Sequence, residues 1–284
     1  MQPRSTRKIE IILNDNFTIN VDLHIKGKIT KSILTLPNSA ICTVYNLSER
    51  TLQRLDEVPK VKILLDGNLL FTGKVINAIN DYIGTSWECN IYCSDIETNP
   101  YIKPQYVEIL SGTSNDQVLN QMGGLISKFG IDKKAFEDCS KAKGSLLKGM
   151  VVEYKKEGDV LKAMQNMFKD CNAEVIKEDG VVKLLDKTKV LNGSKPITIT
   201  LDKLLRSPTL SIKDITVDIP INYKLKLGIG FEVKAKSINK KLESPFTYKN
   251  KFENKIFRVA EFTHEFDNFT SEVAKTLIKG TPIG

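Results

Sequence analysis

The chain contains only two histidines, His24 and His264, so few of the side chains that usually bind metals or activate nucleophiles are available. His264 precedes Glu265, which matches the start of a zinc-binding helix motif, but the second histidine four residues later is missing. His24 falls on the polar face of a predicted strand, where solvation or hydrogen bonding is the default role. We therefore expect no metal-ligating residue.

Three carboxylates, Glu261, Glu265 and Asp267, gather near the end of one predicted strand. A glycosidase needs two carboxyl groups that face each other across a cleft, and sequence spacing does not show such a pair. The phosphate-loop, nucleophile-elbow and dinucleotide motifs are absent, and Gly228-Ile229-Gly230 stands alone as a predicted turn or bulge. We expect a protein that is not an enzyme, with no catalytic residue, no cofactor-binding residue and no cofactor.

The five cysteines include no Cys-x-x-Cys pair and are Cys42, Cys89, Cys93, Cys139 and Cys171. Trp87, Cys89, Ile91 and Cys93 alternate with polar residues and therefore share one face of a predicted strand. The Cα atoms of Cys89 and Cys93 would be about 13 Å apart along such a strand, which is too far for a disulfide. We expect buried free thiols, as in a reducing cytoplasm.

The net charge of +8 is concentrated toward the end of the chain. Residues 196–284 carry 15 basic and 10 acidic side chains, whereas residues 1–105 carry 12 and 11. The stretch 234–255 holds seven lysines and two acids and is predicted to be an exposed loop. Only six of the 42 basic residues are arginine, which argues against sequence-specific DNA recognition.

The elements that would position these residues are mostly strands. At 284 residues and 41% hydrophobic, the composition is that of a globular protein of about two domains. No apolar run approaches the roughly 20 residues that span a bilayer, and the N-terminus lacks the apolar region of a signal peptide. The segments with strand-like patterns are 9–13, 17–25, 29–36, 40–45, 61–65, 69–83, 87–93, 197–201, 210–217, 223–227, 231–235, 256–266 and 271–278.

Helical signals are fewer. Ser48 is a predicted N-cap for a short helix that ends before Pro59, with Leu47 and Leu52 as a hydrophobic staple. Helical spacing predicts two longer helices, over 115–129 and 159–171. A hairpin follows, 173–177 and 181–185, joined through Asp179-Gly180, which is a type I′ turn signal.

Several local patterns occur together in one order. Ala40-Ile-Cys-Thr-Val-Tyr-Asn-Leu-Ser48 precedes the short helix, and a strand pair then ends in Leu70-Phe-Thr-Gly-Lys-Val-Ile76. Leu205-Arg-Ser-Pro208 and Phe257-Arg-Val-Ala-Glu-Phe-Thr-His264 follow later in the chain. In this collinear order the chain resembles the baseplate hub proteins of contractile-tailed phages, a Mu-like tail hub family related to the spike hub domains of type VI secretion.

The resemblance implies a mainly β fold with α insertions: two tube-like β-barrel domains that flank a helix-and-hairpin insert. The expected domains are 1–105, 106–195 and 196–284. It further implies a homotrimer whose barrels alternate in a pseudo-sixfold ring between tail tube and spike. The expected partners are further copies of the chain, the tube protein, the spike protein and other baseplate proteins, in a virion tail assembled in the bacterial cytoplasm.

Two other functions stay open at this level. One is a nucleic-acid-binding module that uses the Lys-rich loop 234–255, because DNA passes through a tail lumen; its binding would weaken steeply with salt. The other is a peptidoglycan-degrading tail enzyme, although no facing carboxylate pair or zinc-ligand set supports it. A hub instead works through shape and large β-rich interfaces.

Overall fold

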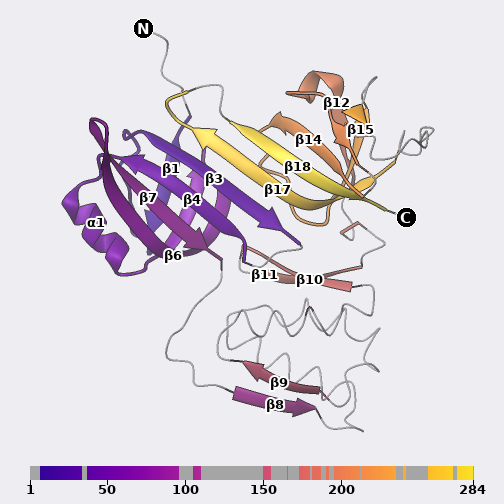
Figure 1. The fold of residues 1–284 in the computed structure, drawn as a ribbon, viewed down its shortest axis with the longest axis horizontal. Coiled ribbons are helices and arrows are strands. Elements are labelled where there is room, and N and C mark those ends of the chain that lie inside the picture. Colours follow the sequence, from indigo (N-terminus) through magenta and orange to yellow (C-terminus); the bar gives the residue numbers. More distant parts are fainter. Residues whose placement is uncertain are drawn as a thin grey trace.

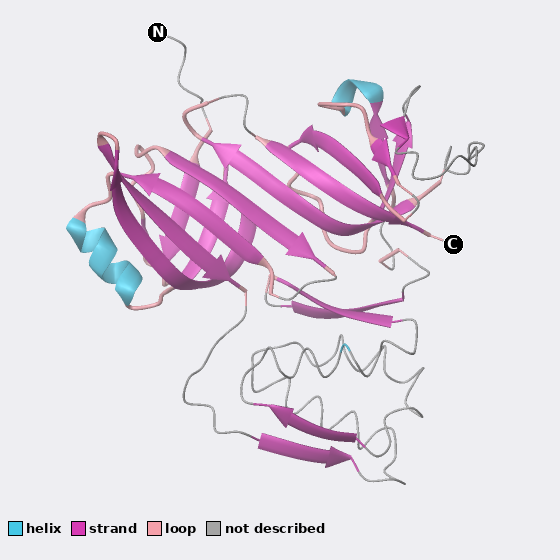
Figure 2. Ribbon diagram, in the orientation of Figure 1, coloured by secondary structure: helices cyan, strands magenta, loops and turns pink. Residues whose placement is uncertain are grey.

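Strands dominate the fold (Figures 1 and 2). The computed structural model describes residues 7–33, 37–95, 105–109, 150–154, 165, 173–179, 181–186, 190–191, 195–211, 213–234, 239–240, 255–270 and 274–283. The expected mainly β class is confirmed. In this part of the chain, no helix is long and apolar enough to cross a membrane.

Among the elements that the structure describes are one complete α-helix, α1 (Glu49–Asp56), and the 3-10 turn η2 (Leu201–Lys203). The strands are β1 (Ile9–Leu13), β2 (Phe17–Thr18), β3 (Ile25–Ser32), β4 (Ser39–Tyr45), β5 (Lys60–Leu65), β6 (Asn68–Ile83), β7 (Ser86–Ser94), β8 (Gln105–Ile109), β9 (Met150–Tyr154), β10 (Ala173–Glu178), β11 (Val181–Asp186), β12 (Ile197–Thr200), β13 (Thr209–Leu210), β14 (Ile215–Pro220), β15 (Gly230–Lys234), β16 (Asn239–Lys240), β17 (Phe257–Asp267) and β18 (Lys275–Pro282).

One sheet joins the two β-rich regions. Its strand order is β16-β13-β14-β18-β17-β3-β4-β7-β6-β5-β1-β2, with β15 and then β12 branching from β17, and it contains 14 of the described strands. Two further antiparallel pairs, β10–β11 and β8–β9, form separate two-stranded sheets. The junction between the regions is the antiparallel pairing of β3 with β17, from Ser32 opposite Glu261 to Lys26 opposite Asp267.

The sheet does not close into the two barrels that we expected. Within the described residues the strand path is open, from β16 at one end to β2 at the other. The physical reason lies in β3, which uses one edge to pair with β4 and the other to pair with β17. Since both edges are occupied, β3 cannot also pair with β1 or β2 to close the first region on itself. The first region is instead a strongly curled part of a shared sheet (Figure 1).

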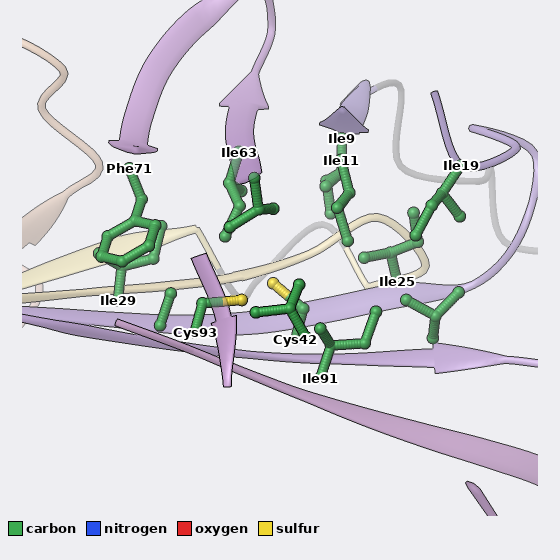
Figure 3. Packing of buried hydrophobic residues seen from close by; sticks show 14 of the residues in the cluster. Ile9, Ile11, Ile19, Ile25, Ile29, Cys42, Ile63, Phe71, Ile91 and Cys93 are labelled. Carbon is green, nitrogen blue, oxygen red and sulfur yellow. The ribbon is translucent and has the colours of Figure 1, made fainter. Parts of the chain in front are cut away.

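Two hydrophobic clusters lie on the same side of this sheet. Phe266 of β17 belongs to the first cluster, and Phe262, four residues earlier on the same strand face, belongs to the second. Isoleucines of β1, β3 and β5 converge with Phe71 of β6 in the first cluster (Figure 3). Both clusters cover one face of the sheet. The opposite face, called the open face below, carries partly exposed charged side chains such as Lys28 and Glu265.

The cysteines confirm the expected thiol chemistry where they are described. Cys42, Cys89 and Cys93 are free and buried, and they point into the first cluster with Ile91. Burial disfavours the thiolate and raises the pKa of Cys93 to about 12. Cys139 and Cys171 lie outside the described residues.

Helix α1 begins as predicted. The Ser48 side chain accepts a hydrogen bond from the Thr51 backbone N–H at 3.4 Å, and Leu47 and Leu52 both pack against the first cluster.

Replacing Ser48 with alanine is expected to lower the free energy of unfolding by about 1 kcal/mol, because one N–H group of the first turn loses its acceptor. Urea unfolding of the full chain measures the loss, and Ser48→Asp should restore most of it because aspartate is an equally good N-cap. Equal losses for alanine and aspartate would contradict a capping role.

Two predicted strands are turns instead. In the segment 17–25 only Phe17–Thr18 is β2, because the Asn20 side chain accepts a hydrogen bond from the Asp22 N–H at 3.0 Å. In 223–227, the Asn222 side chain accepts from the Lys224 N–H at 3.0 Å in the same way. An asparagine that bonds the backbone two residues later competes with strand pairing.

The other predicted elements differ less from those in the structure. The predicted strand 210–217 is broken by a turn in which the Ser211 N–H donates to the Asp214 carbonyl at 2.8 Å, which separates β13 from β14. The hairpin β10–β11 is confirmed, with Asp179 at a positive φ of 52° as a type I′ turn requires. The predicted helices 115–129 and 159–171, apart from Gln165, lie outside the described residues. So does most of the Lys-rich loop, of which Asn239–Lys240 forms β16 beside β13.

Candidate functional site

The open face of the sheet carries cross-strand pairs of opposite charge. Glu265 of β17 lies between Lys28 of β3 and Lys275 of β18, with N–O distances of 3.6 and 3.1 Å. Lys279 of β18 lies 3.4 Å from Asp214, which precedes β14. These pairs are partly exposed, so each contributes little to stability. Each of these three lysines thus has a carboxylate neighbour, with Glu265 shared by two of them.

Two of the three carboxylates that the sequence places near the end of β17 contact neighbouring side chains. Glu265 is held between two lysines, and Asp267 contacts the His24 imidazole, with Oδ1 3.0 Å from Nε2. Asp267 also accepts a hydrogen bond from the Phe269 N–H at 2.7 Å, which shapes the turn after β17. Each of these two carboxylates therefore has a structural partner.

His24 is hydrogen-bonded and stacked. Its ring lies parallel to the ring of Tyr45, with centroids 4.3 Å apart and planes at 6°. This arrangement, together with the contact to Asp267, fixes the imidazole at the edge of the open face.

His264 is buried on the opposite side of β17. Its Nδ1 lies 2.8 Å from the Thr276 hydroxyl. Burial, with a further contribution from the Lys31 charge, lowers the pKa of His264 to about 3, so the ring is neutral at pH 7. The described residues contain no group of three or more His, Cys, Asp or Glu side chains placed to hold a metal ion.

Replacing His264 with glutamine is expected to make the fold less sensitive to mild acid. The unfolded chain protonates this histidine below a pKa of about 6.5, whereas the folded chain does so only near 3. Stability is therefore lost as the pH falls from 6.5 toward 3, by about 1.4 kcal/mol per pH unit from this group. Urea unfolding at pH 7, 6 and 5 should show a smaller decline for His264→Gln; identical declines would contradict the assignment.

A buried polar network lies under the sheet, around Lys31 of β3. Lys31 occupies an inward position of β3 and is 4% exposed. Its ammonium lies 2.7 Å from both carboxylate oxygens of Asp179, at the tip of the β10–β11 hairpin, and 4.0 Å from Glu178. A buried lysine requires such partners because an uncompensated charge is costly away from water.

The hairpin is held at further points. The Asn38 side chain donates to Asp95 at 2.7 Å and to the Lys177 carbonyl at 2.6 Å, and Lys177 Nζ donates to the Asp95 carbonyl at 2.7 Å. Arg258 of β17 donates to Glu174 of β10 at 2.8 Å. The β10–β11 hairpin is thus fixed to strands from both regions, beneath the junction of β3 and β17 (Figure 1).

Sequence reasoning did not identify this network. Its members come from positions between Lys31 and Arg258, and local patterns do not show which of them meet. One signal was present: Lys31 continues the inward alternation of Ile25, Gly27 and Ile29 and so places a charge where an apolar residue is expected. The network joins the β10–β11 hairpin to β3 and β17.

No family model and no curated protein matches this sequence. Solved structures do match. The tail protein from Neisseria meningitidis MC58 superposes with a TM-score of 0.61 at 9% identity. The superposition covers 97% of this chain and 96% of the Neisseria protein. The 43 kDa tail protein of prophage MuSo2 from Shewanella oneidensis superposes with a TM-score of 0.58 at 8% identity. That superposition covers 97% of this chain and 98% of the prophage protein.

A third similar structure is the E. coli c3393 protein, a component of the type VI secretion system described as structurally similar to the T4 tail proteins gp27 and gp5. It superposes with a TM-score of 0.53 at 8% identity and covers 96% of this chain and 77% of its own. The expected likeness to phage tail and type VI secretion proteins is thus confirmed at the level of the fold over nearly the whole chain.

Proposed function

We propose that this chain is a structural baseplate hub of a phage or phage-derived contractile tail. It assembles as a trimeric, pseudo-sixfold ring that joins the tail tube to the spike. The observation that carries the proposal is the architecture of its sheet, in which two β-rich regions, β3-β4-β7-β6-β5-β1-β2 and β17-β18-β14-β13-β16, are joined edge to edge through β3 and β17. The fold likeness to tail proteins supports the same role.

The two regions supply a reason for threefold assembly. Each chain contributes two β-rich segments of one sheet that meet at β3 and β17. Three chains around a common axis present six such segments, which suits a sixfold tube on one side and a threefold spike on the other. We assign the first tube-like domain to residues 1–105, the insert to 106–195 and the second tube-like domain to 196–284.

The open face of the sheet is our candidate for the channel wall. Its central lysines are paired with carboxylates, as around Glu265, so it lacks the uncompensated positive charge that binds nucleic acid tightly. A wall of this kind lets a charged polymer pass without holding it. The role is non-enzymatic, needs no cofactor and belongs to the virion tail, with tube and spike proteins as partners.

The experiment is to purify the full chain and measure its mass in solution. We expect a trimer of three 31.9 kDa chains, about 96 kDa, and a ring with a central channel in electron micrographs. Mixing it with the tube and spike proteins of the same tail should yield a joint complex. A chain that stays monomeric and binds neither protein would contradict the proposal.

A further inference from the structure

The buried amine of Lys31 faces a carboxyl group at close range. Its Nζ lies 2.7 Å from both carboxylate oxygens of Asp179, which is 148 positions later in the chain. Two equal contacts place Nζ in front of the carboxyl carbon, Cγ, at about the 3–3.5 Å that separates two atoms poised to react. An amine and a carboxyl group held in this way can condense to an amide.

Beyond its carboxylate neighbours, Lys31 has apolar surroundings. The Lys31 side chain is 5% exposed, and its Nζ lies 5.9 Å from the centre of the buried Phe262 ring. The Asp179 side chain, by contrast, is 33% exposed. The amine is therefore shielded from water, while the carboxyl group has a side on which a released water molecule can leave.

Glu178 supplies a second carboxylate, for proton transfer. Its side chain is 2% exposed, and its Oε1 lies 4.0 Å from Lys31 Nζ. The Leu227 N–H donates to the same oxygen at 3.3 Å, which holds the carboxylate in place. A carboxylate in this position can take a proton from an attacking nitrogen and return it to the oxygen that leaves.

The other two buried cations of the network make different contacts. Lys177 Nζ donates to the backbone carbonyl of Asp95 at 2.7 Å. Arg258 donates to Glu174 at 2.8 Å, but a guanidinium keeps its protons and so has no electron pair with which to attack. Lys31 combines a primary amine with a carboxyl carbon directly in front of it.

We propose that Lys31 and Asp179 form an intramolecular amide bond, which fixes the tip of the β10–β11 hairpin covalently to β3. A proton first passes from the Lys31 ammonium to the Asp179 carboxylate. The Nζ electron pair then attacks Cγ, and the proton that the nitrogen gives up travels through Glu178 to the hydroxyl group. The Nζ–Cγ bond forms, one Cγ–O bond breaks and one water molecule leaves, so no further reactant is needed.

The bond closes the chain between positions 31 and 179. A cross-link of this kind removes conformational freedom from the unfolded chain, as a disulfide does, and so favours the folded state. It also keeps the hairpin on β3 when acid or salt weakens the ion pair. The bond lies within one chain, so its test is independent of the proposed ring.

Peptide mapping of the full chain, denatured after purification, tests the bond. Trypsin cleaves after a free lysine or arginine but not after an acylated lysine. The bond therefore predicts a branched peptide that joins residues 29–50 to residues 178–183 and is lighter than its two parts by one water molecule. The intact chain should be lighter than its sequence mass by the same amount. A folded wild-type chain of full mass with no branched peptide overturns the proposal.

Three single variants assign the roles. Lys31→Arg keeps the positive charge but presents a guanidinium, so this chain should keep its full mass. Glu178→Gln removes the proton carrier and should lose water at least about tenfold more slowly after refolding. Lys177→Arg is the matched control, because Lys177 is 4% exposed in the same network, and it should lose water as the wild type does. Circular dichroism confirms the folding of each variant, and an unchanged rate in Glu178→Gln would contradict proton transfer through that residue.

The dipeptide Asp179-Gly180 offers one other route to the same change in mass. The backbone nitrogen of Gly180 can attack the Asp179 carboxyl group and form a cyclic imide, in which Lys31 has no part. That product stays in the linear peptide 178–183, and it forms equally in Lys31→Arg. A mass loss that persists in Lys31→Arg therefore overturns the bond, whereas a loss confined to chains that contain Lys31 supports it.

Discussion

Gly27→Ala is expected to destabilise the protein by about 1–3 kcal/mol, although alanine is ordinarily no worse than glycine in a strand. A Cβ atom at this position would lie 2.4 Å from Cζ of Phe266 and 3.3 Å from the sulfur of Cys42. The backbone of Gly27 is not in the positive-φ region, so the clash with the Phe266 ring is the cause. Urea unfolding of the full chain measures the loss.

A double-mutant cycle identifies the contact. Phe266→Ala alone should cost about 3–5 kcal/mol, because a fully buried ring is removed from the first cluster. In that background Gly27→Ala should be neutral or stabilising, which gives a coupling of about 1–3 kcal/mol. Phe71→Ala is the matched control: Phe71 is buried in the same cluster but is not among the atoms nearest to the added Cβ. Equal costs of Gly27→Ala in both backgrounds would rule out the proposed clash.

Lys31→Met is expected to lower the free energy of unfolding by about 3–5 kcal/mol, because it leaves Glu178 and Asp179 at the hairpin without their buried cation. The Lys31 side chain is 5% exposed, and that of Glu178 is 2% exposed. The hairpin is also expected to lose protection against amide hydrogen exchange before the rest of the sheet does.

Lys28→Met provides the comparison on the same strand. Lys28 pairs with Glu265 at 3.6 Å, but its side chain is 57% exposed, so the loss should be at most about 1 kcal/mol. Adding Glu178→Gln to Lys31→Met should recover part of the stability, since it removes one of the stranded charges. If Lys28→Met and Lys31→Met cost the same, the buried network does not anchor the hairpin.

Local patterns predicted elements well where a single short-range rule governs them. Ser48 caps α1 and Asp179-Gly180 turns the β10–β11 hairpin, because each signal depends on residues within one turn of chain. Alternation failed at 17–25 and 223–227 for a common reason: Asn20 and Asn222 bond the backbone two residues later. Apolar residues on either side of such a turn still reach the core, so the pattern of burial survives while the strand does not.

The sequence by itself determined a mainly β chain, buried thiols and the local turns and caps, because burial and hydrogen bonding to near neighbours depend on spacing along the chain. Only the tertiary structure decided that β3 and β17 join the two regions into one open sheet, and that Lys31 meets Asp179 beneath it. Those pairings link residues more than a hundred positions apart. Which strands pair, and which buried charges meet, depends on where they lie in three dimensions. Alternation along the sequence fixes which face of a strand a residue occupies but not which strand lies beside it.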